Sequence, residues 1–207
     1  LDDEFAKHNI YNLGAITTSG ASALFFSKPV HVLEEMAGKK VRGSGGIVDE
    51  ALVNFGASVT FMSAAEQYLA LQTGTVDGVT TTYSSYVSNR LYEVAPYWLN
   101  IIMGRAPYFI IMNKGKWDAL TPDQQQMLIE ATEETLAWSI NSYQEEEQAL
   151  VQEMRAKAQE VYELPSDEWG RWFERVAPLY EKYASTNGEK GKQLMEIYQK
   201  YVQIPNR

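Results

Sequence analysis

The sequence contains no cysteine and only two histidines, His8 and His31. Disulfide frameworks, thiol nucleophiles and cysteine-based zinc sites are therefore excluded, and a histidine-rich metal site or a histidine-dependent triad is not expected. The sequence points to no cofactor and to no metal site. The absence of cysteine also fits an oxidising compartment, where stray thiols are a liability.

Positive charge is scarce. Lysine and arginine total 18 against 27 acidic residues, which gives a formal net charge of -9. A general nucleic-acid binder or a binder of anionic membranes needs a positive field, so neither is expected as a partner. Long apolar runs are also lacking, because no stretch reaches the ~18 residues of a membrane helix. If the ligand is an anion, one local positive group must hold it against the overall charge.

Signals for strands and helices alternate through the first half of the chain. This order predicts an α/β fold with a mostly parallel sheet and right-handed crossovers. The fully apolar run at residues 108–112 predicts a central strand buried on both faces. Residues 10–19 are predicted to form a strand that runs into a loop. The other predicted strands are residues 40–42, 58–62, 79–82, 97–103 and 108–112, and the predicted helices are residues 47–55, 63–73 and 85–95.

The character of the chain changes at Thr121. Thr121, Pro122 and Gln124 form a helix start with a capping box, and no further glycine or proline occurs before Pro165. The pattern predicts one very long helix to about residue 162, or two helices end to end. Shorter helices are predicted at residues 167–183 and 188–201. We divide the chain into an α/β ligand-binding lobe, residues 15–105, and a second part, residues 106–207, with a return strand, the long helix and the C-terminal helices.

Arg42 and the turn that follows it are the first candidate site. In an open α/β sheet, ligands bind beyond the carboxyl ends of the strands. Arg42 ends a predicted strand, and the turn Gly43–Gly46, which includes Ser44, leads into a helix whose first N–H groups attract anions. The guanidinium matches a carboxylate in bidentate fashion. An exposed arginine paired with a nearby glutamate remains an alternative.

Two further segments reach the same edge of the predicted sheet. A run of hydroxyls, which includes Thr80, Thr81 and Tyr83, could hydrogen-bond an oxygen-rich ligand, although threonine also favours strands and serine caps helices. Arg105 lies between two strands, where it is either a second cation for a dicarboxylate or an exposed loop residue.

Enzyme functions have little support. Gly43-Ser44-Gly45 begins like a dinucleotide-binding motif, but Val48 stands where the third glycine belongs. No histidine, cysteine or nucleophile motif lies near Arg42 in the sequence. The alternatives that stay open are an α/β enzyme, or an effector-sensing domain, that binds a phosphate or carboxylate at the Gly43–Gly46 turn. An unrelated ABC-type receptor is a further alternative, which the very long helix disfavours.

Several segments, in order and at consistent spacing, resemble the solute-binding proteins of TRAP transporters (DctP-like). KPVHVLEEMAGKKVR at residues 28–42 is similar to the family's segment that ends in K-[IL]-R. SAAEQYLALQTGTVDG at residues 63–78 is similar to its Y-x-A-L-Q-t-G-x-v-D-G block, and LYEV at residues 91–94 to its f-y-E-v. NKGKWDALTPDQQ at residues 113–125 resembles the entry to the family's long helix. The resemblance covers most of residues 27–135.

This resemblance implies a periplasmic-binding-protein-like fold and a two-lobed, extracytoplasmic receptor without enzymatic activity. Such a receptor binds a small organic acid in the periplasm and delivers it to the membrane permease subunits of a TRAP-type secondary transporter. The family's carboxylate-clamping arginine corresponds to Arg42.

The sequence also departs from the family. Thr81 stands at the position of the asparagine in D-G-x-E-N, no basic residue occurs in residues 17–27, and Ala64 replaces an aromatic residue that stacks in the family's pocket. The family also begins with a strand-rich first lobe that this chain largely lacks. We therefore expect exposed apolar surface and self-association.

Overall fold

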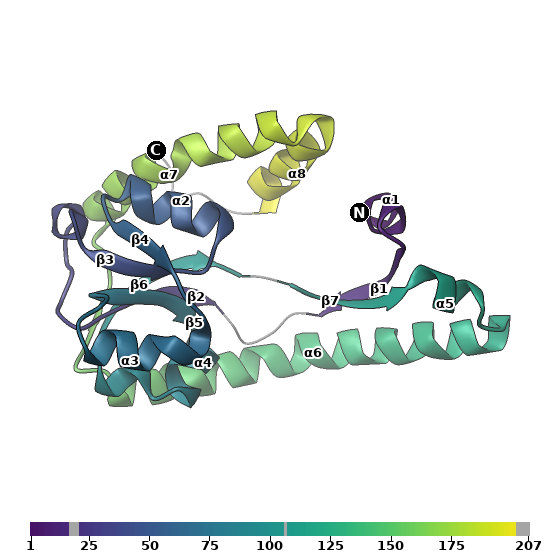
Figure 1. Ribbon diagram of the computed structural model, residues 1–207, viewed down its shortest axis with the longest axis horizontal. Coiled ribbons are helices and arrows are strands. Elements are labelled where there is room, and N and C mark those ends of the chain that lie inside the picture. Colours follow the sequence, from purple (N-terminus) through teal and green to yellow (C-terminus); the bar gives the residue numbers. More distant parts are fainter. Residues whose placement is uncertain (17–20, 106, 202–207) are drawn as a thin grey trace.

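Two sheets and one long helix organise the chain in a computed structural model, which describes residues 1–16, 21–105 and 107–201 (Figure 1). The strands are β1 (Ile10–Ile16), β2 (Ser22–Phe26), β3 (Lys40–Gly43), β4 (Ser58–Phe61), β5 (Gly78–Thr82), β6 (Tyr97–Gly104), β7 (Tyr108–Asn113) and β8 (Glu160–Tyr162). The α-helices are α1 (Asp2–Lys7), α2 (Gly46–Asn54), α3 (Gln67–Gln72), α4 (Tyr83–Ser88), α5 (Lys114–Asp118), α6 (Pro122–Lys157), α7 (Ser166–Thr186) and α8 (Gly188–Tyr201). Short 3₁₀ turns are η1 (Leu33–Met36), η2 (Ala64–Glu66) and η3 (Leu91–Glu93).

The larger sheet has six strands in the order β4-β3-β5-β2-β6-β8. β3 pairs in parallel with β4 and β5, and β6 pairs in parallel with β8. β2 runs antiparallel to both of its neighbours, β5 and β6. The prediction of an α/β fold with a mostly parallel sheet is confirmed, with β2 as the one reversed strand among these six. The carboxyl ends of β3, β4, β5 and β6 therefore meet at one edge of the sheet.

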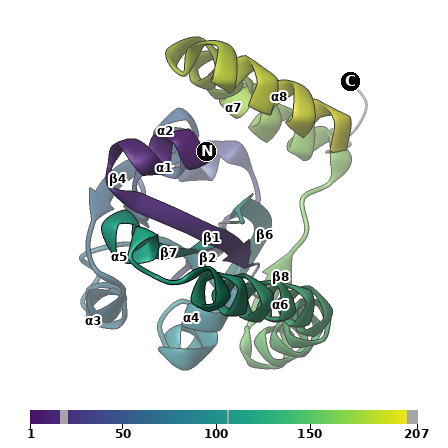
Figure 2. The same ribbon diagram turned by 90° about the vertical axis from the view of Figure 1, so that its right-hand side faces the viewer.

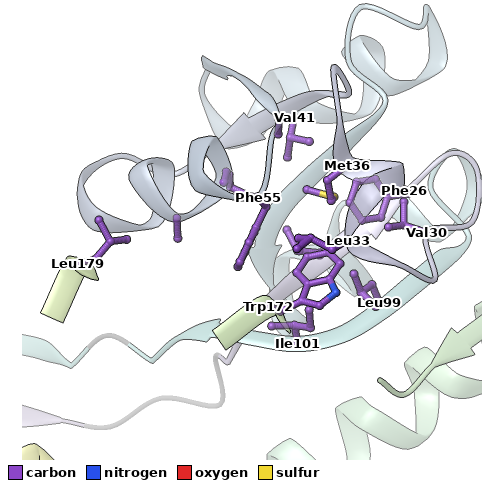
Figure 3. Packing of buried hydrophobic residues seen from close by; sticks show 14 residues of the cluster. Phe26, Val30, Leu33, Met36, Val41, Phe55, Leu99, Ile101, Trp172 and Leu179 are labelled. Carbon is purple, nitrogen blue, oxygen red and sulfur yellow. The ribbon is translucent and has the colours of Figure 1, made fainter. Parts of the chain in front are cut away.

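Both faces of this sheet are covered by helices. One apolar cluster lies between the sheet and α2, η1 and α7, and it includes Phe26, Phe55 and Trp172 (Figure 3). A second cluster fills the opposite face, under α3, α4 and the end of α6, and it includes Phe25 and Trp98. Burying one large apolar side chain such as Phe26 stabilises the fold by about 1.5–3 kcal/mol. Successive residues of β2 thus point to opposite cores, as a sheet buried on both faces requires.

The smaller sheet consists of β1 and β7 in antiparallel pairing. It contains the apolar run at residues 108–112, for which a central, fully buried strand was the prediction. That prediction is wrong, because Tyr108 is 56% exposed and Ile111 52% exposed. An apolar run indicates that a strand favours burial. It does not indicate which other segments of the chain pack against that strand.

The helix α6 is one continuous helix of 36 residues. Its start is the predicted capping box, in which the Thr121 hydroxyl accepts from the Gln124 N–H and the Gln124 side chain accepts from the Thr121 N–H. It contacts α4 beside the larger sheet and β1 at the other end, so it connects the two sheets (Figure 1). It ends at Lys157, and the predicted extension to residue 162 is wrong, because residues 160–162 form β8.

Another predicted helix is interrupted. Residues 85–95 do not form one helix, because α4 ends at Ser88 and Arg90 adopts a left-handed backbone with φ of 55°. η3 follows as a separate turn, and the Tyr86 hydroxyl donates to the Ala95 carbonyl to close the segment.

The C-terminal helices return to the larger sheet. α7 packs on α2 and η1, α8 packs on α7 (Figure 2), and Lys190 of α8 forms an ion pair with Glu4 of α1 at 2.7 Å. β8 pairs with β6 and α7 packs on α2, so segments from both parts of the predicted domain division lie together. The division between residues 105 and 106 stays a prediction. Within the described residues, no helix combines the length and the apolar character needed to cross a membrane.

Candidate functional site

Arg42 lies at the carboxyl edge of the larger sheet and is only 8% exposed. Its Nε and Nη2 donate to the Met62 carbonyl at 3.0 and 2.9 Å, and its Nη1 donates to the Thr80 carbonyl at 3.0 Å. The alternative of an exposed arginine paired with glutamate does not describe this side chain. Burial lowers the pKa of Arg42, and the charge of Asp49 opposes that shift.

This anchoring leaves part of the guanidinium uncommitted. A guanidinium carries five N–H groups. Three of them donate to Met62 and Thr80, so two remain without a partner among the described residues, one on each Nη atom. N–H groups on a planar, charged guanidinium can donate to the oxygens of a carboxylate.

The Gly43–Gly46 turn is organised by Asp49. The Asp49 Oδ1 accepts from the Gly45 N–H at 2.9 Å, and the carboxylate lies only 2.0 Å from where a Cβ on Gly43 would be. The N–H of Gly45, the residue that precedes α2, thus already donates to a protein carboxylate. Ser44 is exposed on this turn. Asp49 was not singled out by the sequence, although an acidic residue in the first turn of a helix is the usual signal for such a role.

The hydroxyl run divides between the two faces of the sheet. Arg42 pairs with Val79 and Thr81 pairs with Ala23, and both partners belong to the cluster under α3 and α4. The side chains of Arg42 and Thr81 therefore share that face. Thr80 pairs with Leu24, so its side chain faces the opposite cluster, and its hydroxyl has no hydrogen-bond partner. Thr80 contributes its carbonyl, not its hydroxyl, to the surroundings of Arg42.

Tyr83 is a largely enclosed side chain at the start of α4. It is 3% exposed, its ring packs edge-on against Trp98, and its hydroxyl donates to the Asn100 Oδ1 at 3.5 Å. Burial raises the pKa of Tyr83 to about 12, and the charge of Glu147 adds to the shift while Arg105 opposes it. The hydroxyl is therefore a neutral donor at ordinary pH.

Arg105 is engaged by a carboxylate of the long helix. Its two Nη atoms donate to the two oxygens of Glu147, at 2.5 and 2.7 Å, and its guanidinium lies 5.5 Å from the centre of the Tyr143 ring. The structure does not place Arg105 in contact with Arg42 or Thr81. A ligand that used Arg105 as a second cation would have to compete with Glu147.

Gln67 is a polar side chain near this edge that the sequence did not mark. It is the first residue of α3, it is 0% exposed, and neither its Nε2 nor its Oε1 has a hydrogen-bond partner among the described residues. Gln67, Ala70 and Leu71 form the buried face of α3 at i, i+3 and i+4 spacing. That spacing, with one glutamine beside two apolar residues, is the signal that could have indicated its burial.

A separate cavity of about 780 Å³ lies between α2, the end of β6, α7 and α8. Its walls are mainly apolar, and Arg105 stands among them. The cavity is not lined by Arg42, Thr81 or Gln67. Within residues 1–16, 21–105 and 107–201, no group of three or more histidine, aspartate or glutamate side chains is arranged to hold a metal ion.

Comparison with known proteins gives a consistent family match. The family model described as "Bacterial extracellular solute-binding protein, family 7" (DctP) matches residues 1–187. The chain is 30% identical over 176 residues to the C4-dicarboxylate-binding periplasmic protein DctP of Rhodobacter capsulatus, covering 84% of this chain and 53% of that protein. The chain thus spans about half the length of the curated relatives that it matches.

Solved structures agree with this match. The chain is similar to a TRAP periplasmic solute-binding protein from Sulfitobacter sp. NAS-14.1 with bound β-D-galacturonate, at a TM-score of 0.83 and 28% identity, over 96% of this chain and 66% of that one. It is also similar to a TRAP periplasmic solute-binding protein from Chromohalobacter salexigens with bound D-glucuronate, at a TM-score of 0.84 and 25% identity, over 96% of this chain and 65% of that one.

Proposed function

The chain belongs to family 7 of the bacterial extracellular solute-binding proteins, the DctP family of TRAP transporters, and on that premise we propose that it binds a small organic acid through Arg42. The family consists of binding proteins rather than enzymes. The α/β enzyme and the effector-sensing domain, which the sequence alone left open, therefore give way to a receptor. The proposal places the ligand carboxylate on the two uncommitted N–H groups of Arg42.

The geometry of Arg42 is the observation that carries this proposal. The side chain is enclosed, fixed by two backbone carbonyls, and still offers a pair of donors. A positive group buried in a protein of net charge -9 gives an anion one local site of attraction. Charge-assisted bidentate hydrogen bonds are the strong kind, and they are strongest where water is excluded.

The relatives support a carboxylate as the ligand. One is named for C4-dicarboxylates, and two solved relatives hold galacturonate and glucuronate, all of which are carboxylates. We propose Arg42 and Thr81 as the central contacts of this site. Ser44, Thr80, Tyr83 and Arg105 stay predicted ligand residues, of which Arg105 requires release from Glu147.

The proposed partners follow from the family. We propose that the protein acts in the periplasm and delivers its ligand to TRAP membrane permease subunits. Self-association also stays a proposal, supported by exposed apolar side chains such as Tyr108 and Trp138, which are 56% and 64% exposed. Light scattering at high concentration tests it, and a strictly monomeric mass would count against it.

The test of the proposed function is thermal unfolding against a panel of organic acids. A ligand present at a hundred times its dissociation constant stabilises the folded state by about 2.7 kcal/mol. We expect one acid to raise the melting temperature of the parent protein and not that of Arg42→Ala. Arg175→Ala, which changes an exposed arginine on α7, is the matched control and should respond like the parent. If Arg42→Ala still responds fully, Arg42 is not the clamp.

A further inference from the structure

The buried amide of Gln67 has no partner within the described residues. The side chain is 0% exposed, and both Nε2 and Oε1 lack a hydrogen bond. Buried polar atoms are hydrogen-bonded in the great majority of folded proteins, so an amide with both ends unpaired calls for an explanation. An apolar residue would fit the buried face of α3 beside Ala70 and Leu71 without this cost.

The position of Gln67 relates it to Arg42. α3 covers the face of the larger sheet on which the side chains of Arg42 and Thr81 lie, because Ala70 and Leu71 share a cluster with Val79, the register partner of Arg42. Gln67 is at the N-terminal end of α3, and η2 is all that separates that end from Ser63 and Met62. The Met62 carbonyl is the anchor of the Arg42 guanidinium.

The other unpaired polar atoms of the larger sheet do not share this setting. The Thr80 hydroxyl faces the opposite cluster, and Trp98 belongs to β6, beyond β2. Gln67 is therefore a buried side chain without a hydrogen-bond partner that lies on the same face of the larger sheet as Arg42. Its helix, α3, begins beside the carboxyl edge of that sheet. Arg42 and Thr81 are themselves 8% and 6% exposed, so both side chains are enclosed by protein on this face.

We propose that Gln67 is a specificity-determining residue that recognises a hydroxyl group on the carbon next to the carboxylate held by Arg42. A glutamine amide offers donors on Nε2 and an acceptor on Oε1, and a hydroxyl both donates and accepts. The ligand class is therefore a 2-hydroxy carboxylate. An acid without the hydroxyl would leave both amide atoms unpaired, and a site built to pair with a hydroxyl rejects such an analogue. This inference rests on the proposed function of the same site.

The experiment compares acids that differ by one hydroxyl, malate against succinate and lactate against propionate. Dissociation constants are measured by calorimetry on the full-length natural protein. We expect the hydroxy acid of at least one pair to bind roughly tenfold to a hundredfold tighter than its partner, because its partner leaves the buried amide unpaired. In Gln67→Met, which keeps the length of the side chain and removes its polar atoms, the ratio should fall to about one. Gln67→Leu provides a second variant should the first fail to fold.

Gln72→Leu is the matched control, because Gln72 is an exposed glutamine on the same helix. It should keep the preference of the parent. An unchanged ratio in Gln67→Met, together with a higher melting temperature, would show a purely structural glutamine and overturn the proposal. Equal binding of both acids by the parent would overturn it too, while leaving the receptor function standing. If the parent binds no carboxylate at all, the proposed function fails first and this inference fails with it.

Discussion

Arg42 and Met62 are joined by two hydrogen bonds, from Nε and Nη2 of the guanidinium to a single carbonyl oxygen, at 3.0 and 2.9 Å. Met62 is the first residue after β4, and Arg42 belongs to β3. The Arg42 side chain therefore fixes the point at which the chain leaves β4. The same contact orients the remaining N–H groups of Arg42. One pair of residues thus serves both the architecture of the edge and the proposed carboxylate clamp.

The first prediction concerns stability without ligand. Arg42→Met removes the three bonds to the Met62 and Thr80 carbonyls and leaves these acceptors less satisfied. We expect the free energy of unfolding to fall by about 1–3 kcal/mol. Urea denaturation measures the change, and Arg175→Met, on the exposed face of α7, should stay within about 0.5 kcal/mol of the parent. A variant as stable as the parent would mean that Met62 finds another donor.

The second prediction concerns the glycine turn. A Cβ on Gly43 would lie 2.0 Å from the Asp49 carboxylate, so Gly43→Ala must displace Asp49 from the Gly45 N–H. We expect a loss of about 1–3 kcal/mol in the free energy of unfolding. In a protein that already carries Asp49→Ala, Gly43→Ala should cause almost no further loss in the free energy of unfolding. Such coupling distinguishes a steric clash with Asp49 from an effect of alanine on the backbone of the turn.

Gly170→Ala is the control for this cycle. Gly170 lies within α7, and a Cβ built on it meets nothing within 4 Å. Alanine is a better helix former than glycine, so this change should stabilise the protein by about 0.5–1 kcal/mol. Additive losses for Gly43→Ala and Asp49→Ala would contradict the steric explanation.

Much of this edge could be predicted from the sequence, because its signals are local. The strand that ends in Arg42, the glycine turn, the helix that follows it and both capping boxes are short-range patterns, and the structure shows each of them. Alternating strand and helix signals also predict β3, β4, β5 and β6 and the mostly parallel character of the larger sheet. β2 and the short strand β8 were not predicted. β8 has only three residues, and it depends on β6 for its pairing.

The remaining features depend on contacts between distant segments. The exposure of β7 reflects what lies beside it, and the apolar sequence of that strand carries no such information. Gln67 looks like an ordinary polar helix residue until the helix is packed on the sheet. The direction of Thr80 away from Arg42 follows from the β2–β5 register, which no local pattern fixes.

The third prediction concerns Glu168, the carboxylate that ties α7 to η1. Glu168 is 9% exposed, and its Oε2 accepts from the Leu33 N–H and from the Trp172 Nε1, both at 3.3 Å. Glu168→Ala leaves both donors buried without this acceptor. Because the hydrogen bonds involve a charged group, we expect a loss of about 1.5–3 kcal/mol in the free energy of unfolding. Glu174→Ala, an exposed glutamate of α7, should be neutral, and equal effects of the two changes would contradict this role.

The fourth prediction concerns pH. Hydrogen bonds from Lys190 and Lys7 lower the pKa of Glu4 to about 2, below its ordinary value of 4.5. A depressed folded pKa stabilises the fold above pH 4.5, and this contribution is lost as the pH falls towards 2. We expect Lys190→Gln to raise the pKa of Glu4, as measured by NMR titration of its side chain. Lys192→Gln, on the same helix, should leave it unchanged. An unchanged Glu4 pKa in Lys190→Gln would show that α8 does not hold α1.

The fifth prediction tests Arg105 as a ligand residue. Glu147 occupies both Nη atoms of Arg105, so a dicarboxylate can use this arginine only by displacing Glu147. Glu147→Gln removes the competing charge and keeps the size of the side chain. If Arg105 holds the second carboxylate, this variant should bind a dicarboxylate such as succinate tighter by a factor of about ten, because a displaced charged pair of this kind is worth roughly 1–2 kcal/mol.

The matched measurement is a monocarboxylate such as propionate, whose affinity should not change in Glu147→Gln because it has no second charge for Arg105 to hold. Arg105→Gln should weaken succinate and leave propionate unaffected. Calorimetry on both acids gives the ratio of the two dissociation constants, which is independent of general effects on folding. If the ratio is the same in the parent and in both variants, Arg105 acts only as a tie between the end of β6 and α6, and Arg42 is left as the cation of the proposed site.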